Sequence, residues 1–364
     1  MKNKISFNKI FWIGMMLFSM FFGAGNLIFA PFLGVQAAGN TPLALLGFIC
    51  TSVVVPISAI IILARFKDGR SMLERISKPL AVVFMSLVYL LIGPCIAIPR
   101  TATTSFEMFS WLIPDTGLFR FLFACLFFGS SFLVALHPNK LKDVLGKVMS
   151  PILLILVCAV CFGALIMPDT VSQVIVHYDQ DPFGTGFVEG YQTMDILAAF
   201  CFGNIMIMNI KNEGIRHEKA VHGVLVRAAV IAGLLLAGIY GLLAFSGMLR
   251  SETLLSCTNG AQVLSALSGQ IFGGAGQIIN ALIFLIACFN VCTGLLSCVS
   301  EYFHDLLPKW PYRKWLILFT LAGLIVSCFG LDVILSVSAP ILNFLCPVAI
   351  VFLVYGIFAG RRKS

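Results

Sequence analysis

The sequence predicts an all-α membrane protein whose chain crosses the bilayer about ten times. Hydrophobic residues make up 59% of the 364 residues and charged residues only 11%, with a mean hydropathy of +1.00. A soluble domain carries about 25% charge, so the composition excludes one. The apolar residues come in runs of about 20, the length that an α-helix needs to cross ~30 Å of hydrocarbon.

The apolar runs can be placed along the chain with boundaries that are soft by a few residues. They lie near 10–33, 42–64, 80–99, 119–136, 148–167, 187–209, 224–248, 271–300, 315–330 and 333–358. The first run is longer than the apolar segment of a secretory signal, which has about 7–15 residues. We therefore expect it to be a membrane helix and not a cleaved leader.

The placement of the basic residues indicates the orientation. All of the 24 lysines and arginines except Arg100, Arg120 and Arg250 fall in alternate segments between the runs. These segments are the N-terminus, 65–78, 140–147, 211–227, 309–314 and 361–363. By the positive-inside rule both termini are cytoplasmic, in a multi-pass protein of the cytoplasmic (inner) membrane. The net charge of +8 is thus topological, and no nucleic-acid partner is expected.

Ten runs divide into two sets of five. We expect a first repeat over 1–167, an outer loop over 168–186 and a second repeat over 187–364. An odd number of helices in each half makes the second half run through the membrane inverted, as in many secondary transporters. If the first helix is broken at mid-membrane, the sixth should then be broken as well.

The stretch FFGAGNLIFAP at 21–31 interrupts the first run with Gly23, Gly25, Asn26 and Pro31. A break frees backbone groups that hydrocarbon leaves unsatisfied, unless protein, water or a ligand binds them. The half-helix that begins here offers N–H groups to an anion. Its carbonyls and the Asn26 amide suit a monovalent cation. The alternative is that the glycines only allow close helix packing.

The sixth run, GYQTMDILAAFCFGNIMIMN, repeats part of this pattern. Its letters FGN at 202–204 echo Phe22, Gly23 and Asn26, so we expect the second break there. Asp195 precedes that break, and an acid inside a membrane indicates function. It would bind a cation, carry a proton or attract a substrate ammonium group. Alternatively, it caps the half-helix or lies at the outer interface.

Other polar and helix-breaking residues have simpler interpretations. Arg100 and Glu107, seven apart, are expected to form an interfacial pair. Two runs contain internal prolines, and 250–270 could form a short outer helix that caps the site. The twelve cysteines lie mostly within the runs, so no disulfide framework is expected. We find no catalytic constellation, no cofactor motif and no metal ligands beyond those for a transported cation.

Four stretches resemble the branched-chain amino acid:cation symporter family. They are FSMFFGAGNLIFAPFLG at 18–34, IGPCIAIPRTATTSFE at 92–107, GYQTMDILAAFCFG at 190–203 and YF at 302–303. The family is similar in turn to the leucine-transporter-like fold, in which helices 1 and 6 are unwound at the site. The resemblance implies substrate-binding roles for Gly23, Ala24, Gly25, Ala199, Phe200, Phe202 and Gly203. It implies cation-binding roles for Asn26 and Phe22.

Two features depart from that family. Where members carry two threonines in helix 8, this chain reads ACFNVCTGL, with Asn290 and Val291 at those positions. We therefore expect one sodium site at most, with Asn290 a candidate ligand for a second. Members also continue for two further spans, whereas this chain ends with RRKS at 361–364. Those spans lie outside the five-plus-five core.

The resemblance implies a secondary transporter, not an enzyme, that imports leucine, isoleucine or valine with a cation. Sodium is favoured over a proton as the coupling ion, and no cofactor is expected. The partners are the amino acid and the lipid bilayer, while the oligomeric state is left open. The alternatives are a transporter of the same fold for another small solute, and an intramembrane enzyme or non-transport subunit of a membrane complex.

Overall fold

The computed structural model describes residues 6–66, 69–114, 116–174, 176–215 and 217–361. Within these ranges the chain is helical and contains no strand. Several basic residues of the predicted charge bias lie outside the described residues, as does Ser364 of the chain end. These basic residues are Lys2, Lys4, Lys67, Arg216, Arg362 and Lys363.

The helices follow the predicted runs. In chain order they are α1 (Phe7–Phe21), α2 (Ala24–Ala37), α3 (Thr41–Ile49), α4 (Val55–Leu63), α5 (Gly69–Leu73), α6 (Lys78–Leu90), α7 (Ala97–Glu107), α8 (Gly117–Ala135), α9 (Ser150–Ile166), α10 (Val176–Gln180), α11 (Pro182–Glu189), α12 (Asp195–Asn212), α13 (Glu218–Leu249), α14 (Gly260–Phe272), α15 (Gly274–Leu306), α16 (Tyr312–Ser327) and α17 (Leu331–Arg361). Short π and 3-10 turns link some of them, notably η2 (Cys50–Val54), η3 (Leu91–Cys95), η5 (Lys142–Met149) and η6 (Gly190–Thr193).

Seven helical stretches in the described chain are long and apolar enough to cross a membrane, or eight if one bent pair counts as a span. The bent pair is Pro182–Thr193 with Asp195–Asn212. The helix Phe7–Phe21 is apolar but shorter, and α16 has 16 residues. A helical membrane protein is thus confirmed. The count of ten spans and the five-plus-five inverted repeat stay predictions.

The break predicted in the first run is confirmed. Helix α1 ends at Phe21 and α2 begins at Ala24, with Phe22 and Gly23 in extended conformations between them. The Gly23 N–H donates to the side-chain oxygen of Asn26 over 2.9 Å. Asn26 therefore satisfies a backbone donor that the break frees, and this contact fixes the start of α2.

The break predicted at 202–204 is in the wrong place. Helix α12 continues through these residues, and the chain bends by 43° eight residues earlier, between η6 and α12. Met194 adopts a left-handed conformation there, with φ of 66°. The physical reason is that a glycine inside a helix is tolerated, whereas a non-glycine residue at positive φ ends the turn before it.

Two glycines bring α2 and α13 into direct backbone contact. A Cβ atom on Gly34 would lie 1.9 Å from the carbonyl oxygen of Ala244. A Cβ atom on Gly247 would lie 2.2 Å from the carbonyl oxygen of Pro31. Neither position accommodates a side chain without backbone movement, so these glycines hold the half-helix α2 against a long, unbroken helix.

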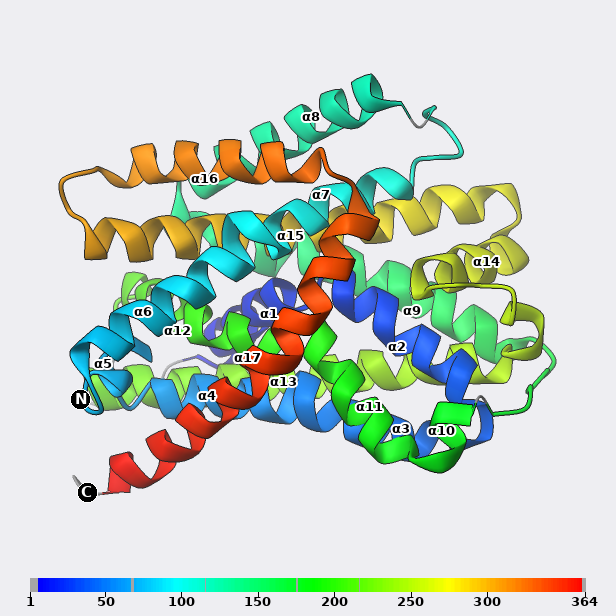
Figure 1. Ribbon diagram of the computed structural model, residues 1–364, viewed down its shortest axis with the longest axis horizontal. Coiled ribbons are helices and arrows are strands. Elements are labelled where there is room, and N and C mark those ends of the chain that lie inside the picture. Colours follow the sequence, from blue (N-terminus) through cyan, green and yellow to red (C-terminus); the bar gives the residue numbers. More distant parts are fainter. Residues whose placement is uncertain (1–5, 67–68, 115, 175, 216, 362–364) are drawn as a thin grey trace.

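The segment 168–186, expected as a loop, is partly helical. It contains α10 and the start of α11, and α11 packs along α3 (Figure 1). The short helix expected within 250–270 is present as α14. A Cβ atom on its Gly260 would lie 1.7 Å from the Ile28 carbonyl oxygen of α2. Helix α14 thus packs against the half-helix α2.

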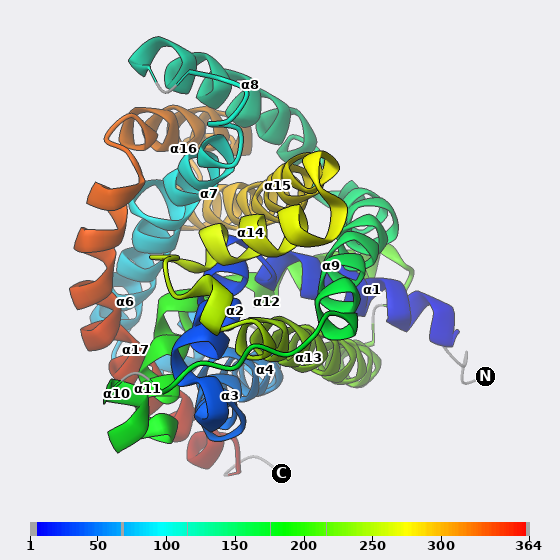
Figure 2. The same ribbon diagram turned by 90° about the vertical axis from the view of Figure 1, so that its right-hand side faces the viewer.

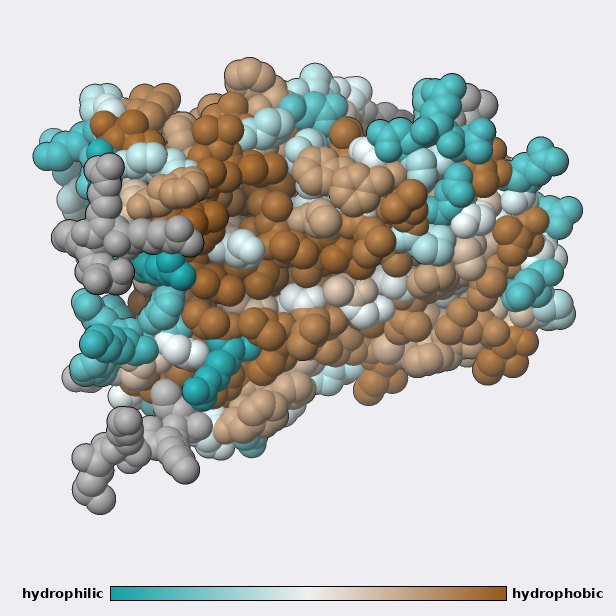
Figure 3. All heavy atoms as spheres, turned by 90° about the horizontal axis from the view of Figure 1, so that it is seen from below, coloured by the Kyte–Doolittle hydropathy of each residue, from teal (hydrophilic) through white to brown (hydrophobic). Residues whose placement is uncertain are grey.

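The broken helices lie inside the bundle. Figure 2 shows α2 and α12 between α13, α15, α6 and α7, with α1 entering the bundle from its right-hand edge beside α9, and α8, α16 and α17 farther out. Apolar side chains cover the middle of the face seen in Figure 3, and polar ones gather at its two ends. Large apolar side chains point outward on the peripheral helices, for example Leu126, Ile166 and Phe344. This distribution is the one expected for a protein surrounded by lipid.

An ion network joins three elements at one end of the bundle. Glu213, just after α12, forms ion pairs with Lys142 of η5 and with Lys9 of α1, the latter at 3.0 Å. The α4–α5 connection, the α15–α16 connection and the end of α17 lie at the left end in Figure 1. These segments carry much of the predicted basic excess.

Candidate functional site

A small enclosed cavity lies where the two breaks meet, with a volume of about 30 Å³. Its polar wall comes from α2, α7, η6 and α12 and consists of Asn26, Arg100, Thr101, Thr193 and Asp195. Its apolar wall contains Met20, Phe21, Ile92, Ala198, Phe202, Val291 and Leu295. The backbone of residues 23–25 faces the same space, as do Ala97 and Met194.

Asn26, Asp195 and Tyr240 form the polar centre of this site. The Asn26 amide donates to the Asp195 carboxylate over 2.7 Å and also contacts the Tyr240 hydroxyl. The Tyr240 hydroxyl lies 3.4 Å from the same carboxylate oxygen. All three side chains are buried. The contact therefore joins α2 to the start of α12, across the two breaks, and both to α13.

Asp195 is the first residue of α12 and is only 2% exposed. The interpretation that it lies at an outer interface is therefore wrong. A buried carboxylate is costly unless a cation, a proton or strong donors accompany it. The position of Asp195 is compatible with ion binding, with proton carriage and with a contact to a substrate ammonium group.

Arg100 is the residue that the sequence analysis placed incorrectly. It is 5% exposed and donates through one guanidinium nitrogen to the Gln192 carbonyl over 3.2 Å. Its other terminal nitrogen lies 2.8 Å from where a Cβ atom on Gly25 would stand. The pair expected with Glu107 is wrong. The two residues lie on one face of α7 but about 10 Å apart along its axis, at ~1.5 Å per residue, and the Arg100 guanidinium bonds to the Gln192 carbonyl instead.

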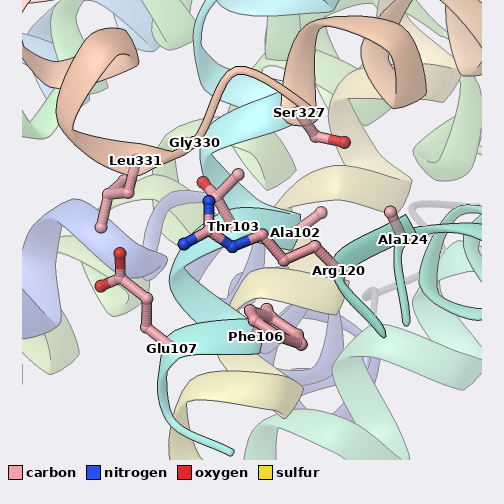
Figure 4. Close-up of a pocket in the computed structure, with 9 residues that line it drawn as sticks. All are labelled: Ala102, Thr103, Phe106, Glu107, Arg120, Ala124, Ser327, Gly330 and Leu331. Carbon is pink, nitrogen blue, oxygen red and sulfur yellow. The ribbon is translucent and has the colours of Figure 1, made fainter. Parts of the chain in front are cut away.

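Glu107 belongs to a separate cavity of about 30 Å³ between α7, α8 and the α16–α17 connection. Figure 4 shows its carboxylate facing the guanidinium of Arg120 across this space. Ser327, Gly330 and Leu331 form the remaining side. Glu107, the predicted partner of Arg100, thus lies about two helical turns farther along α7 and near Arg120 of α8.

The glycines of the first break leave room for close neighbours. A Cβ atom on Gly23 would lie 2.6 Å from a methyl carbon of Val291. A Cβ atom on Gly25 would lie 2.8 Å from Arg100 and 3.2 Å from the Thr193 Cα atom. Val291 lies in α15, where the sequence departs from the family pattern, and it packs directly against the break.

The structure brings some of the sequence-predicted residues to the cavity and not others. Gly23, Ala24, Gly25, Asn26, Phe202 and Asp195 line it. Phe22 packs instead between Phe18 and Tyr240, with ring centroids 5.2 and 6.1 Å apart.

Four other predicted residues do not line this cavity: Ala199, Phe200 and Gly203 of α12 and Asn290 of α15. Phe200 packs against Phe84, while Ala199 and Gly203 are buried on other faces of α12. Asn290 is buried, and within the described chain its amide has no hydrogen-bond partner. The helical period explains these positions, since α12 turns Ala198 and Phe202, four residues apart, toward the space.

Sequence reasoning missed the roles of Tyr240 and Arg100 at this site. The signal for Arg100 was available, because an intramembrane charge indicates a functional site by default. Tyr240 had only a weak signal, as a single tyrosine in an apolar helix whose hydroxyl needs a buried partner.

A cavity enclosed by two interrupted helices, with one apolar and one polar wall, is suited to a small amphipathic solute. Its volume is far below the ~300–1,000 Å³ of ordinary ligand sites, so a solute enters only when the surrounding half-helices move. These features define a helical membrane transporter with discontinuous helices.

Two solved structures share this fold. MhsT, determined in complex with L-phenylalanine, matches 94% of this chain and 87% of its own, with a TM-score of 0.56 and 16% identity. Mhp1 in an inward-facing conformation matches 98% of this chain and 77% of its own, with a TM-score of 0.50 and 16% identity. At this identity the likeness concerns the fold alone.

The family is shown by sequence. The model of the family described as "Branched-chain amino acid transport protein" matches residues 6–362, and the chain belongs to that family. It is 36% identical to the branched-chain amino acid permease BrnQ of Bacillus subtilis, over 100% of this chain and 85% of the relative. It is 37% identical to the branched-chain amino acid permease BrnQ of Corynebacterium glutamicum, over 92% of this chain and 78% of the relative. The chain is a transport protein and not an enzyme.

Proposed function

We propose that the chain imports branched-chain amino acids together with a cation, with sodium favoured over a proton. The single observation that carries this proposal is the contact between Asn26 and Asp195 inside the cavity where both interrupted helices begin. It places the Asp195 carboxylate and the Asn26 amide side by side at a half-helix N-terminus. The names of the relatives, branched-chain amino acid permeases, support the substrate class.

The two walls of the cavity support a division of roles. The apolar wall, with Met20, Phe202 and Leu295, suits a branched aliphatic side chain. The first turn of α2 has N–H groups without partners in its own helix, and these suit the substrate carboxylate. Asn26 and Asp195 then hold the cation, or Asp195 carries the proton, and the same carboxylate faces the ammonium group of the substrate.

The charge distribution supports an orientation for this import. The α15–α16 connection and the end of α17, which carry basic residues, lie at one end of the bundle, which we assign to the cytoplasm. Both termini are then cytoplasmic, in the cytoplasmic membrane.

Uptake of labelled leucine by vesicles that contain only this protein tests the proposal. One cation that enters down 100 mV releases ~2.3 kcal/mol. That energy supports roughly 40-fold accumulation of a zwitterion, at ~1.4 kcal/mol per tenfold. Vesicles with an inside-negative potential should therefore concentrate leucine, isoleucine and valine when the coupling ion is present.

The control is the same preparation with the potential collapsed by an ionophore. Uptake that only reaches equal concentrations would indicate a facilitator and would contradict symport. Uptake of another small solute in place of these amino acids would favour a transporter of the same fold with a different substrate. Imposing the sodium gradient and the pH gradient separately identifies the coupling ion.

A further inference from the structure

We propose that Arg100 is a substrate-binding residue, and that its guanidinium pairs with the carboxylate of the transported amino acid. This inference rests on the proposed function. It gives the α7 wall of the cavity a role in binding, and it makes a charged group, not only backbone N–H groups, the carboxylate partner.

The first step is the placement of the guanidinium. Arg100 is 5% exposed, lines the cavity and has a terminal nitrogen against Gly25, in the first turn of α2. Both the guanidinium and the helix N-terminus attract an anion, and here they face the same space. A carboxylate placed between them would accept hydrogen bonds from both.

The second step concerns the charge of Arg100. Its one hydrogen bond from the side chain within the described chain goes to the Gln192 carbonyl, and no ion pair joins it to a described acid. A buried guanidinium with a single neutral acceptor keeps donors in reserve, because it carries five N–H groups in a fixed fork. A carboxylate matches that fork geometry.

The third step is the match to a zwitterion. An α-amino acid carries opposite charges on two groups attached to one carbon, so both partners must line one small cavity. Arg100 and Asp195 do so, from α7 and α12. The same guanidinium also bonds to the carbonyl of Gln192, which lies in η6 just before the second break. The proposed carboxylate partner is thus in contact with the segment that precedes the second break.

The test compares leucine with leucinamide, which keeps the ammonium group and the side chain but has no carboxylate charge. Displacement of labelled leucine is measured on the purified full-length protein in lipid nanodiscs. The unaltered protein should bind leucine more tightly than leucinamide. Arg100→Gln should lower the leucine affinity by ~10- to 100-fold, the range for the loss of a hydrogen bond to a charged group. The leucinamide affinity should stay close to that of the unaltered protein, so that the preference disappears.

The matched control is Arg250→Gln. Arg250 is also a buried arginine, but it donates to the Pro168 carbonyl and the Gln270 side chain, away from the cavity. This variant should keep the leucine preference even if it is less stable. Arg100→Lys, which retains a charge without the fork, should keep a reduced preference and covers the case in which Arg100→Gln does not fold.

Four results distinguish the possible failures. A folded Arg100→Gln variant with the original preference would show that Arg100 only supports η6, and would overturn the inference. Arg100→Lys without any preference would overturn it too. An unaltered protein that binds leucine and leucinamide equally would refute carboxylate pairing while leaving the proposed function intact. An unaltered protein that binds no branched-chain amino acid would refute the proposed function itself.

Discussion

The side-chain amide of Asn26 donates a 2.7 Å hydrogen bond to the carboxylate of Asp195, 169 residues farther along the chain. This contact joins the half-helix that begins after the first break to the helix that begins after the second. Tyr240 of the unbroken helix α13 completes the cluster. Helices α2 and α12 are therefore connected through the buried Asp195 carboxylate. A change in its charge or in its bound ligand acts on both helices.

The first prediction concerns Gly25. A Cβ atom there would lie 2.8 Å from Arg100 and 3.2 Å from the backbone of Thr193, so Gly25→Ala displaces the guanidinium and Gly25→Leu fills the cavity. We expect leucine binding to weaken by at least ~10-fold in Gly25→Ala and to be lost in Gly25→Leu. Gly241→Ala in α13, where a Cβ atom meets nothing within 4 Å, is the control. Normal leucine affinity in Gly25→Leu would count decisively against the site.

The second prediction concerns the coupling ion. Asn26→Ala removes the amide that contacts both Asp195 and Tyr240, so it should raise the sodium concentration for half-maximal uptake or uncouple transport. Asp195→Asn is the competing test, since a proton-coupled carrier would lose its pH dependence in that variant. Vesicle uptake at varied sodium and pH measures both. If the unaltered protein ignores sodium and follows pH through Asp195, the proton proposal replaces the sodium proposal.

The third prediction concerns Asn290, whose buried amide has no partner among the described residues. An unsatisfied buried polar group costs ~1–3 kcal/mol, so Asn290→Leu should raise the free energy of unfolding by about that amount. With a single sodium site at Asn26 and Asp195, the melting temperature of this variant should still rise when sodium is added. A smaller sodium-induced rise than in the unaltered protein would instead identify Asn290 as a ligand of a second ion.

The fourth prediction concerns Val291, which packs against Gly23 at the break. Val291→Thr keeps the shape of the side chain and adds a hydroxyl oxygen, which is a ligand suited to sodium. Combined with Asn290→Thr, it should increase the sodium dependence of uptake. An unchanged sodium response in the double variant would mean that α15 does not contribute to ion binding, even with both hydroxyls present.

The fifth prediction concerns sidedness. Cys257 lies between α13 and α14, and partial burial raises the pKa of its thiol above the ordinary value. Only the thiolate reacts with maleimides, so labelling should be slow at pH 7 and rise about tenfold per pH unit until that pKa is reached. A membrane-impermeant maleimide should label it in right-side-out vesicles, and the signal should fall in Cys257→Ser. Labelling of Cys257 only in inside-out vesicles would reverse the proposed orientation.

The sequence alone was enough to predict a helical membrane protein, the approximate positions of its apolar runs and the break in the first run. These features depend on local composition: a run of apolar residues must be helical in lipid, and glycines with an asparagine in that run interrupt it. Motif stretches such as FSMFFGAGNLIFAPFLG also pointed to the right family. Each of these signals lies in neighbouring residues, and no long-range contact was needed to interpret it.

The position of the second break, and the set of side chains that line the cavity, depend on contacts between distant parts of the chain. Met194 carries no local signal for its left-handed conformation, and the Gln192 carbonyl two residues before it accepts a hydrogen bond from Arg100 of another helix. The same is true of Tyr240, which reaches Asn26 over 214 positions. Helical periodicity gives the face of each residue but not the helix that this face meets. Only the packing of α2, α7, α12 and α13 around one space brought an arginine, an aspartate and an asparagine together.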